Sequence, residues 1–292
     1  MSKKVVFIAF VVSLGGFLFG FDAGIISGVM SYAGPEFNLT DGQTGWVVSS
    51  PSFAAMIAML ISGRLSDVIG RKKILIVVAL LYAVSALASA YATSYEMLYI
   101  ARMIGGLAFG AALILAPTYI AEISSAENRG KLVSTTIEFL VKLLSNYYFN
   151  KINTSGNSFL NDENVWRWML GVEFIPAIMY FLFMFFVPKS PRWLCSRGKM
   201  NEAKVVLNQL YGEQLAKVEI ESIEKNINES QKQEKVSILE LLKPSLRFIL
   251  IVGLVLGVLQ QITGINAVYF YATSIFKQTG IGTDASFASG IL

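Results

Sequence analysis

The sequence predicts an all-α integral membrane protein. Of its 292 residues, 54% are apolar and only 15% are charged, whereas soluble domains carry about 25% charged residues. The apolar residues gather in long runs, and about 20 helical residues suffice to cross a hydrocarbon core of about 30 Å. Mean hydropathy is +0.57.

Seven of these runs are predicted to span the membrane: residues 5–30, 44–65, 74–91, 98–120, 132–149, 168–187 and 248–276. An eighth begins at residues 285–292. The first run follows Lys3 and Lys4, as a signal peptide would. This apolar run is too long for a signal peptide and contains Asp22, so we expect it to be an uncleaved span.

Basic residues set the predicted orientation. Most of the 24 lysines and arginines precede the first span or lie between spans 2 and 3, 4 and 5, or 6 and 7. The opposite segments hold only Lys151, Arg167 and Lys277. Cytoplasmic segments carry the excess of basic residues, so we expect a multi-pass protein of the cell membrane with a cytoplasmic N-terminus.

A long polar stretch, residues 189–243, divides the chain. It contains an amphipathic helical pattern over residues 201–211 and a charged, polar segment over residues 220–235. We therefore predict a six-span half (1–187), a cytoplasmic helical linker (188–246) and the start of a second transmembrane half (247–292). This layout is typical of two-halved transporters.

Composition argues against an enzyme. The chain has no histidine and one cysteine, Cys195, which excludes Ser-His-Asp catalysis, His-ligated metals and an internal disulfide. No span shows paired acids or a nucleophile beside a base. We expect no metal, no cofactor and no nucleic-acid partner. A proton carrier within the membrane must then be a carboxylate.

Span 1 combines a small-residue face with an acid. Four glycines recur at every fourth position: Gly16, Gly20, Gly24 and Gly28. This spacing predicts close packing against another helix. Asp22 lies on the opposite side and should face a partner or a watery cavity, since a charge in the membrane is costly. Arg102 of span 4 either pairs with Asp22 or extends toward the interface.

Two further segments carry candidate sites. Between spans 2 and 3, the Gly63–Lys73 segment holds Asp67 and Arg71 around a tight turn, which suits a charge latch or simple positive-inside charge. In span 7, a break at Gly264 would bring the amides of Gln260 and Asn266 together. Such amides suit a neutral polyhydroxy ligand, although they can also join helices.

These motifs together resemble the sugar porters of the major facilitator superfamily. The resemblance rests on six segments in family order: Gly15–Asp22, Gly63–Lys73, Arg102–Gly110, Pro117–Glu122 with Arg129-Gly130, Ser190-Pro191-Arg192, and Gln260-Gln261 with Gly264-Ile265-Asn266. It implies a fold of twelve spans in two halves, of which this chain would supply about seven.

The resemblance also implies residue roles. Asp22 would carry the proton with Arg102 as its partner, and the sugar would contact Gln260, Gln261, Asn266 and Tyr271. The cytoplasmic latch would comprise Gly63, Asp67, Arg71, Glu122, Arg129 and Arg192. The implied function is secondary active transport of a monosaccharide by alternating access with proton symport. The expected partners are the sugar, protons and the lipid bilayer.

Two alternatives stay open. Facilitative family members usually lack the acid at position 22, so Asp22 argues against a uniporter. A non-transporting remnant or sugar sensor is favoured by two departures. Residues 134–146 of span 5 lack the family's glutamine and carry Glu138 and Lys142, which are spaced to pair on one helix face. The sequence also stops after span 7, so a second half is a further expected partner.

Overall fold

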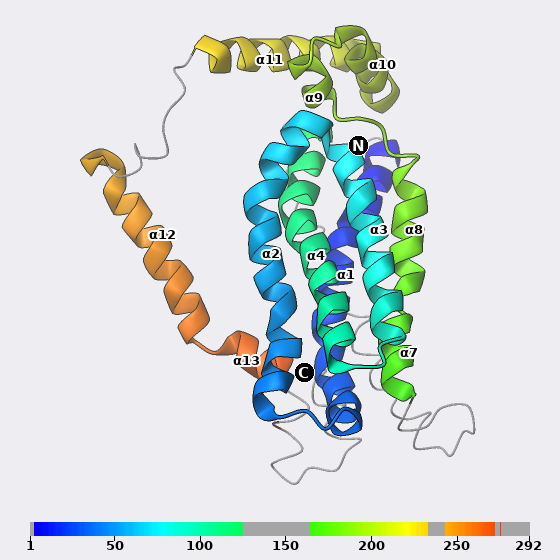
Figure 1. The fold of residues 1–292 in the computed structure, drawn as a ribbon. Coiled ribbons are helices and arrows are strands. Elements are labelled where there is room, and N and C mark those ends of the chain that lie inside the picture. The colour runs from blue at the N-terminus through cyan, green and yellow to red at the C-terminus, as the bar shows by residue number, and fades with distance from the viewer. Residues whose placement is uncertain (1–2, 125–163, 233–242, 272–274, 276–292) are drawn as a thin grey trace.

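The computed structural model describes residues 3–124, 164–232, 243–271 and 275. All elements in this part of the chain are helices (Figure 1): α1 (Lys3–Glu36), α2 (Asp41–Ile69), α3 (Arg71–Ala90), α4 (Tyr95–Ile123), α7 (Val165–Gly171), α8 (Phe174–Met184), α9 (Pro191–Ser196), α10 (Met200–Tyr211), α11 (Glu213–Lys232), α12 (Pro244–Ile262) and α13 (Ile265–Phe270).

Six membrane-spanning segments lie within the described residues. They are α1, α2, α3, α4, the α7–α8 pair and the α12–α13 pair. They match six of the seven predicted spans. The predicted fifth span (132–149), with Glu138 and Lys142, and the start of an eighth lie outside the described residues.

Helix α4 occupies the middle of the bundle and packs against α1, α2 and α3. Its contact with α2 depends on two glycines. A Cβ on Gly106 would lie 2.3 Å from the carbonyl oxygen of Pro51, and one on Gly110 would lie 2.5 Å from that of Ala55. The close packing predicted for the glycine face of span 1 is not found at Gly20 among the described residues, because a Cβ there would meet none of their heavy atoms within 4 Å.

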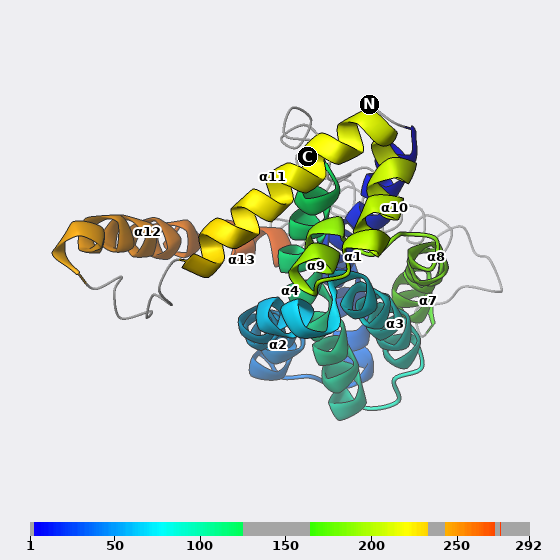
Figure 2. The same ribbon diagram turned by 90° about the horizontal axis from the view of Figure 1, so that it is seen from above.

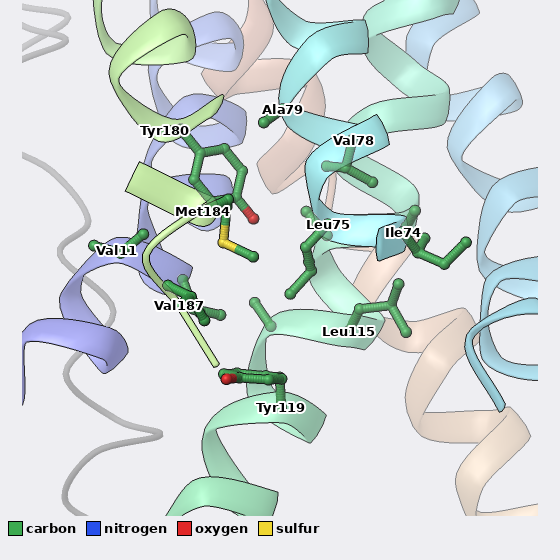
Figure 3. Close-up of a cluster of buried hydrophobic side chains, with 14 of the residues drawn as sticks. Val11, Ile74, Leu75, Val78, Ala79, Leu115, Tyr119, Tyr180, Met184 and Val187 are labelled. Atoms are coloured by element: carbon green, nitrogen blue, oxygen red, sulfur yellow. The ribbon is translucent and has the colours of Figure 1, made fainter. Parts of the chain in front are cut away.

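The main core lies where α1, α3, α4 and α8 meet. Figure 3 shows Val11, Leu75, Leu115 and Met184 converging between these helices, and all four are almost fully buried. The buried Tyr82 donates a hydrogen bond to the carbonyl oxygen of Gly15 over 2.9 Å. A transmembrane bundle gains little from apolar burial alone, so such close packing and interhelical hydrogen bonds hold it together.

Helices α9, α10 and α11 form a helical cap across one end of the bundle (Figure 2). We call that end the cap end and the opposite one the far end. Tyr119 of α4 donates to the carbonyl of Pro188 over 2.6 Å, and Tyr211 of α10 donates to the carbonyl of Ile123. The helix predicted at 201–211 is confirmed as α10, and most of the charged segment 220–235 belongs to α11.

The far end is held by a charge cluster between α1 and α7. Arg167 pairs with Glu36 over 2.6 Å and also donates to the carbonyl of Ala92. Trp166 donates from Nε1 to the other carboxylate oxygen of Glu36, and the Arg167 guanidinium lies 4.3 Å from its ring centroid. These contacts fix α7 against the end of α1.

The predicted break at Gly264 is present. Gly264 has φ 72°, a left-handed conformation that suits glycine. It separates α12, in which no residue is buried, from α13, which lies against α1. Figure 1 shows α12 standing apart from the bundle while α13 returns to its far end.

Candidate functional site

A buried ion pair links α1 to α4. Arg102 donates from Nη1 to Asp22 Oδ1 over 2.8 Å and from Nη2 to Oδ2 over 3.2 Å. Its Nε donates to the carbonyl of Val47 in α2 over 3.1 Å. The side chain of Arg102 is 3% exposed and that of Asp22 is 19% exposed. Arg102 is therefore paired and does not extend to the membrane interface.

The buried guanidinium of Arg102 finds hydrogen-bond acceptors on two helices, α1 and α2. The two parallel hydrogen bonds to Asp22 are the strong, directional kind that a guanidinium makes with a carboxylate. Asp22 keeps some exposure, so water can reach the carboxylate while Arg102 stays covered. Protonation of Asp22 would remove the charge that balances Arg102, which makes the pair a candidate proton-sensitive contact.

A buried acidic residue lies near the pair. Glu173 occupies the turn between α7 and α8, is 5% exposed, and interacts electrostatically with both Asp22 and Arg102. The sequence predictions did not include it. A single acid inside predicted span 6, two residues after Gly171, was the available signal. Glu173 is therefore a second acidic group whose electrostatic effect reaches the Asp22–Arg102 pair.

The predicted sugar-binding amides partly converge. Asn266 Nδ2 donates to Gln261 Oε1 over 2.9 Å across the break at Gly264. Gln260 also lies near the end of α12, and its backbone carbonyl accepts from Thr263 Oγ1 over 2.6 Å. All three amide side chains are exposed. Beyond the hydrogen bond between Asn266 and Gln261, these amides have further donors and acceptors that suit a polyhydroxy ligand.

Tyr271 follows α13, where this helix reaches the far end of the bundle. It packs with Phe270 against the core formed by α1, α2, α4 and α7. A Cβ on Gly45 of α2 would lie 3.7 Å from the Tyr271 hydroxyl. Tyr271 therefore lies between α13 and α2, one helix beyond the break that carries the Gln261–Asn266 hydrogen bond.

The predicted latch forms in part at the cap end. Arg71 pairs with Asp67 over 2.6 Å and with Glu122 over 3.1 Å, which joins α2, α3 and α4. Gly63 contributes a carbonyl that accepts from Ser66 Oγ over 2.8 Å. Arg129 lies outside the described residues. Arg192 is exposed on α9, and the structure does not join it to this network.

Two neighbours of Arg192 do reach the latch. Trp193 Nε1 donates to the carbonyl of Asp67 over 3.0 Å, and Arg197 donates to the carbonyls of Asp67 and Val68, each over 2.9 Å. These carbonyls belong to the last turn of α2, where helical acceptors lack intrahelical donors and a positive charge is favourable. Trp193 and Arg197 were absent from the predicted latch.

Metal binding has no support in the described residues, where no three acidic or cysteine side chains cluster as metal ligands would.

In the cap, burial raises the pKa of the Cys195 thiol, with a smaller effect from the nearby Glu224. A hydrogen bond from Lys189 lowers the pKa of Glu202.

Comparison with known proteins places these features in a family. The family described as "Sugar (and other) transporter" matches residues 8–292. The arabinose-proton symporter of Bacillus subtilis is 39% identical over 98% of this chain and 61% of its own length. The D-xylose transporter of Levilactobacillus brevis is 36% identical over 98% of this chain and 61% of its own.

Solved structures of sugar transporters have the same fold as this chain. The proton:xylose symporter XylE bound to 6-bromo-6-deoxy-D-glucose superposes with a TM-score of 0.84 at 30% identity, over 100% of this chain and 66% of that one. XylE from E. coli in a partially occluded inward-open conformation gives 0.83 at 29% identity, over 98% and 69%. The chain belongs to the sugar transporter family and has the major facilitator fold. It spans about 61% of the length of the curated relatives named above.

Proposed function

We propose that this chain contributes to sugar:proton symport, with Asp22 as the proton-carrying acid and a monosaccharide as the substrate. The observation that carries the proposal is the buried, two-fold hydrogen-bonded pair of Asp22 and Arg102. The relatives named as an arabinose-proton symporter and a proton:xylose symporter support it.

The coupling step follows from the Asp22–Arg102 pair. With Asp22 ionised, Arg102 is held by α1 and by the Val47 carbonyl of α2. When Asp22 takes up a proton, the attraction between α1 and α4 weakens, while the hydrogen bond from Arg102 to Val47 remains. This weakening couples a proton to a movement of α1 against α4.

We assign sugar recognition to the junction of α12 and α13. Gln260, Gln261 and Asn266 present amides beside the broken helix, a device by which membrane carriers build binding sites. Amide groups both donate and accept, which matches sugar hydroxyls. Movement of α13 against α1 and α2 would open or close the far end around the sugar.

The proposed orientation puts the cap end in the cytoplasm. The cap and the adjoining helix ends carry Lys4, Lys72, Lys73 and the lysines of α10 and α11, as the positive-inside rule requires. The Arg71 network then holds the cytoplasmic ends of α2, α3 and α4 together. A protease that cleaves the cap only from the cytoplasmic side of sealed membranes tests this orientation.

The experiment that tests the function is uptake by proteoliposomes containing the full chain. A radiolabelled pentose or hexose is supplied outside, with the outside more acidic than the inside. Uptake above that of protein-free liposomes, which falls when the proton gradient is collapsed, is the expected result. Absence of both uptake and sugar binding, the latter followed by tryptophan fluorescence, would overturn the proposal.

A second candidate is a sugar-binding membrane protein that does not transport. It is favoured by residues 134–146, which lack the glutamine typical of the family and carry Glu138 and Lys142. Sugar binding with no uptake under any gradient would select it. Uptake that persists unchanged without a proton gradient would instead select a facilitative uniporter.

A further inference from the structure

A groove opens at the cap end between the first turns of α1, the end of α8 and helix α10. Its cavity measures about 410 Å³, and its lining includes Lys4, Phe7, Phe186, Pro188, Gln209 and Leu210. A second cavity of about 470 Å³ continues from it, sharing Pro188 and Gln209 and reaching Lys189 and Glu202. None of these residues takes part in the Asp22 site or the amide pair.

The groove has a large exposed apolar floor. Phe186 is 77% exposed and Phe7 is 46% exposed, although both adjoin membrane-spanning helices. The Phe7 ring lies 6.2 Å from that of Phe183, which extends the aromatic surface into α8. Because α1 begins at Lys3 and α8 ends at Met184, this surface lies at the boundary between headgroups and acyl chains.

The mouth of the groove is positively charged. Lys4 lies exposed at one side, and in the described part of the chain no carboxylate pairs with it. Lys72 donates to the carbonyl of Phe185 over 2.8 Å, which holds a second ammonium close by. Glu202, the acid that lines the adjoining cavity in the described residues, is already bound by Lys189 at 2.9 Å and Lys199 at 3.4 Å.

We propose that this groove binds an anionic phospholipid from the leaflet that surrounds the cap end. Its phosphate lies between the Lys4 ammonium and the Gln209 amide, and an acyl chain lies along Phe7 and Phe186. An apolar floor beside an unpaired lysine matches a charged headgroup on a hydrocarbon chain. Because the lining comes from α1, α10 and the segment after α8, the bound lipid also joins the cap to the bundle.

The test uses the purified full chain in neutral detergent. Phosphatidylglycerol and phosphatidylcholine with identical acyl chains are titrated, and bound lipid is counted by native mass spectrometry. We expect one phosphatidylglycerol to be retained in preference to phosphatidylcholine. Lys4→Gln should weaken that binding by about fivefold, the effect of one lysine near a membrane surface. Lys204→Gln, an exposed lysine of α10 outside the groove, should leave it unchanged.

Other outcomes overturn the proposal. Equal binding of the two lipids would mean that charge does not select the occupant. Equal losses in Lys4→Gln and Lys204→Gln would mean diffuse surface attraction in place of a site. Binding of a poly-glutamate peptide with no preference between the lipids would assign the groove to an acidic protein segment. Phe186→Ala provides a second check: it should weaken lipid retention without unfolding the protein, because the ring is mostly exposed.

Discussion

Trp193 of α9 lies against Gly70, the residue that joins α2 to α3. A Cβ on Gly70 would lie 3.2 Å from two carbons of the Trp193 ring, and Gly70 has φ 101°. Glycine is therefore needed at this position both for its backbone conformation and for the space it leaves. The contact, together with the Trp193 hydrogen bond to Asp67, docks the cap onto the end of α2.

The first prediction is that Gly70→Ala loosens the cap. The substitution should cost about 1–3 kcal/mol in backbone strain, and it should push Trp193 away from α2. The readout is alkylation of Cys195, the single cysteine, which is buried in the cap and whose pKa is raised by burial. A raised pKa leaves less thiolate at neutral pH, so the docked cap reacts slowly with maleimide.

We expect Gly70→Ala and Trp193→Ala to accelerate that alkylation, each relative to the wild type. Gly198→Ala is the control for backbone strain without loss of docking, because Gly198 has a positive φ and a Cβ there would meet no heavy atom of the described residues within 4 Å. Acceleration by Gly198→Ala to the same extent, or unchanged rates in both test variants, would show that the Gly70–Trp193 contact does not hold the cap.

Much of the fold was predictable because apolar runs and glycine breaks act locally. The six described spans, α10 and the break at Gly264 all follow from such patterns. The pairing of Asp22 with Arg102 was one of two arrangements that the sequence left open, and in the structure Arg102 pairs with Asp22 and does not extend toward the interface.

What could not be predicted depends on tertiary packing. Sequence indicated Arg192 for the latch, but the docking angle of α9 turns Trp193 and Arg197 toward α2 and leaves Arg192 exposed. Tyr271 falls at the far end because α13 returns to α1 after the break at Gly264. Glu173 is a lone acid in its span, and only the turn between α7 and α8 brings it close to Asp22.

The second prediction concerns Arg71. Arg71→Met leaves the carboxylate of Glu122, 6% exposed, without its partner, and removing one member of a buried ion pair costs about 3–5 kcal/mol. Thermal unfolding in detergent should show a large decrease in midpoint. Asp67→Asn is the control, because Asp67 is 67% exposed and an exposed pair contributes about 0–1 kcal/mol. Equal effects of the two substitutions would contradict this assignment.

The third prediction concerns the contact between α2 and α4. Gly106→Ala and Gly110→Ala each place a methyl group against α2 backbone atoms that cannot move without displacing the helix, and such overpacking costs about 1–3 kcal/mol or more. Both variants should give less monodisperse protein on size exclusion. Gly253→Ala in α12 should behave as the wild type, because within the described part of the chain a Cβ there would meet no heavy atom within 4 Å. Normal behaviour of all three variants would argue against the α2–α4 packing.

The fourth prediction concerns the position of Glu173. Glu173→Gln removes the second acidic group near the pair, so the unfavourable electrostatic effect between Glu173 and Asp22 is lost and Asp22 should keep Arg102 more firmly. Sugar uptake by proteoliposomes should then require a more acidic outer solution than the wild type. An unchanged pH profile would mean that Glu173 has no influence on the Asp22–Arg102 pair.

The most direct test of the central claim is the Asp22→Asn variant in proteoliposomes, with two measurements on one preparation. Asparagine keeps the shape of the side chain but cannot carry the proton. The account predicts loss of accumulation against a sugar gradient, with exchange of labelled for unlabelled sugar retained. Asp41→Asn, an exposed acid in the first turn of α2, should keep both activities. Accumulation by Asp22→Asn at the wild-type level would contradict the assignment of Asp22 as the proton carrier.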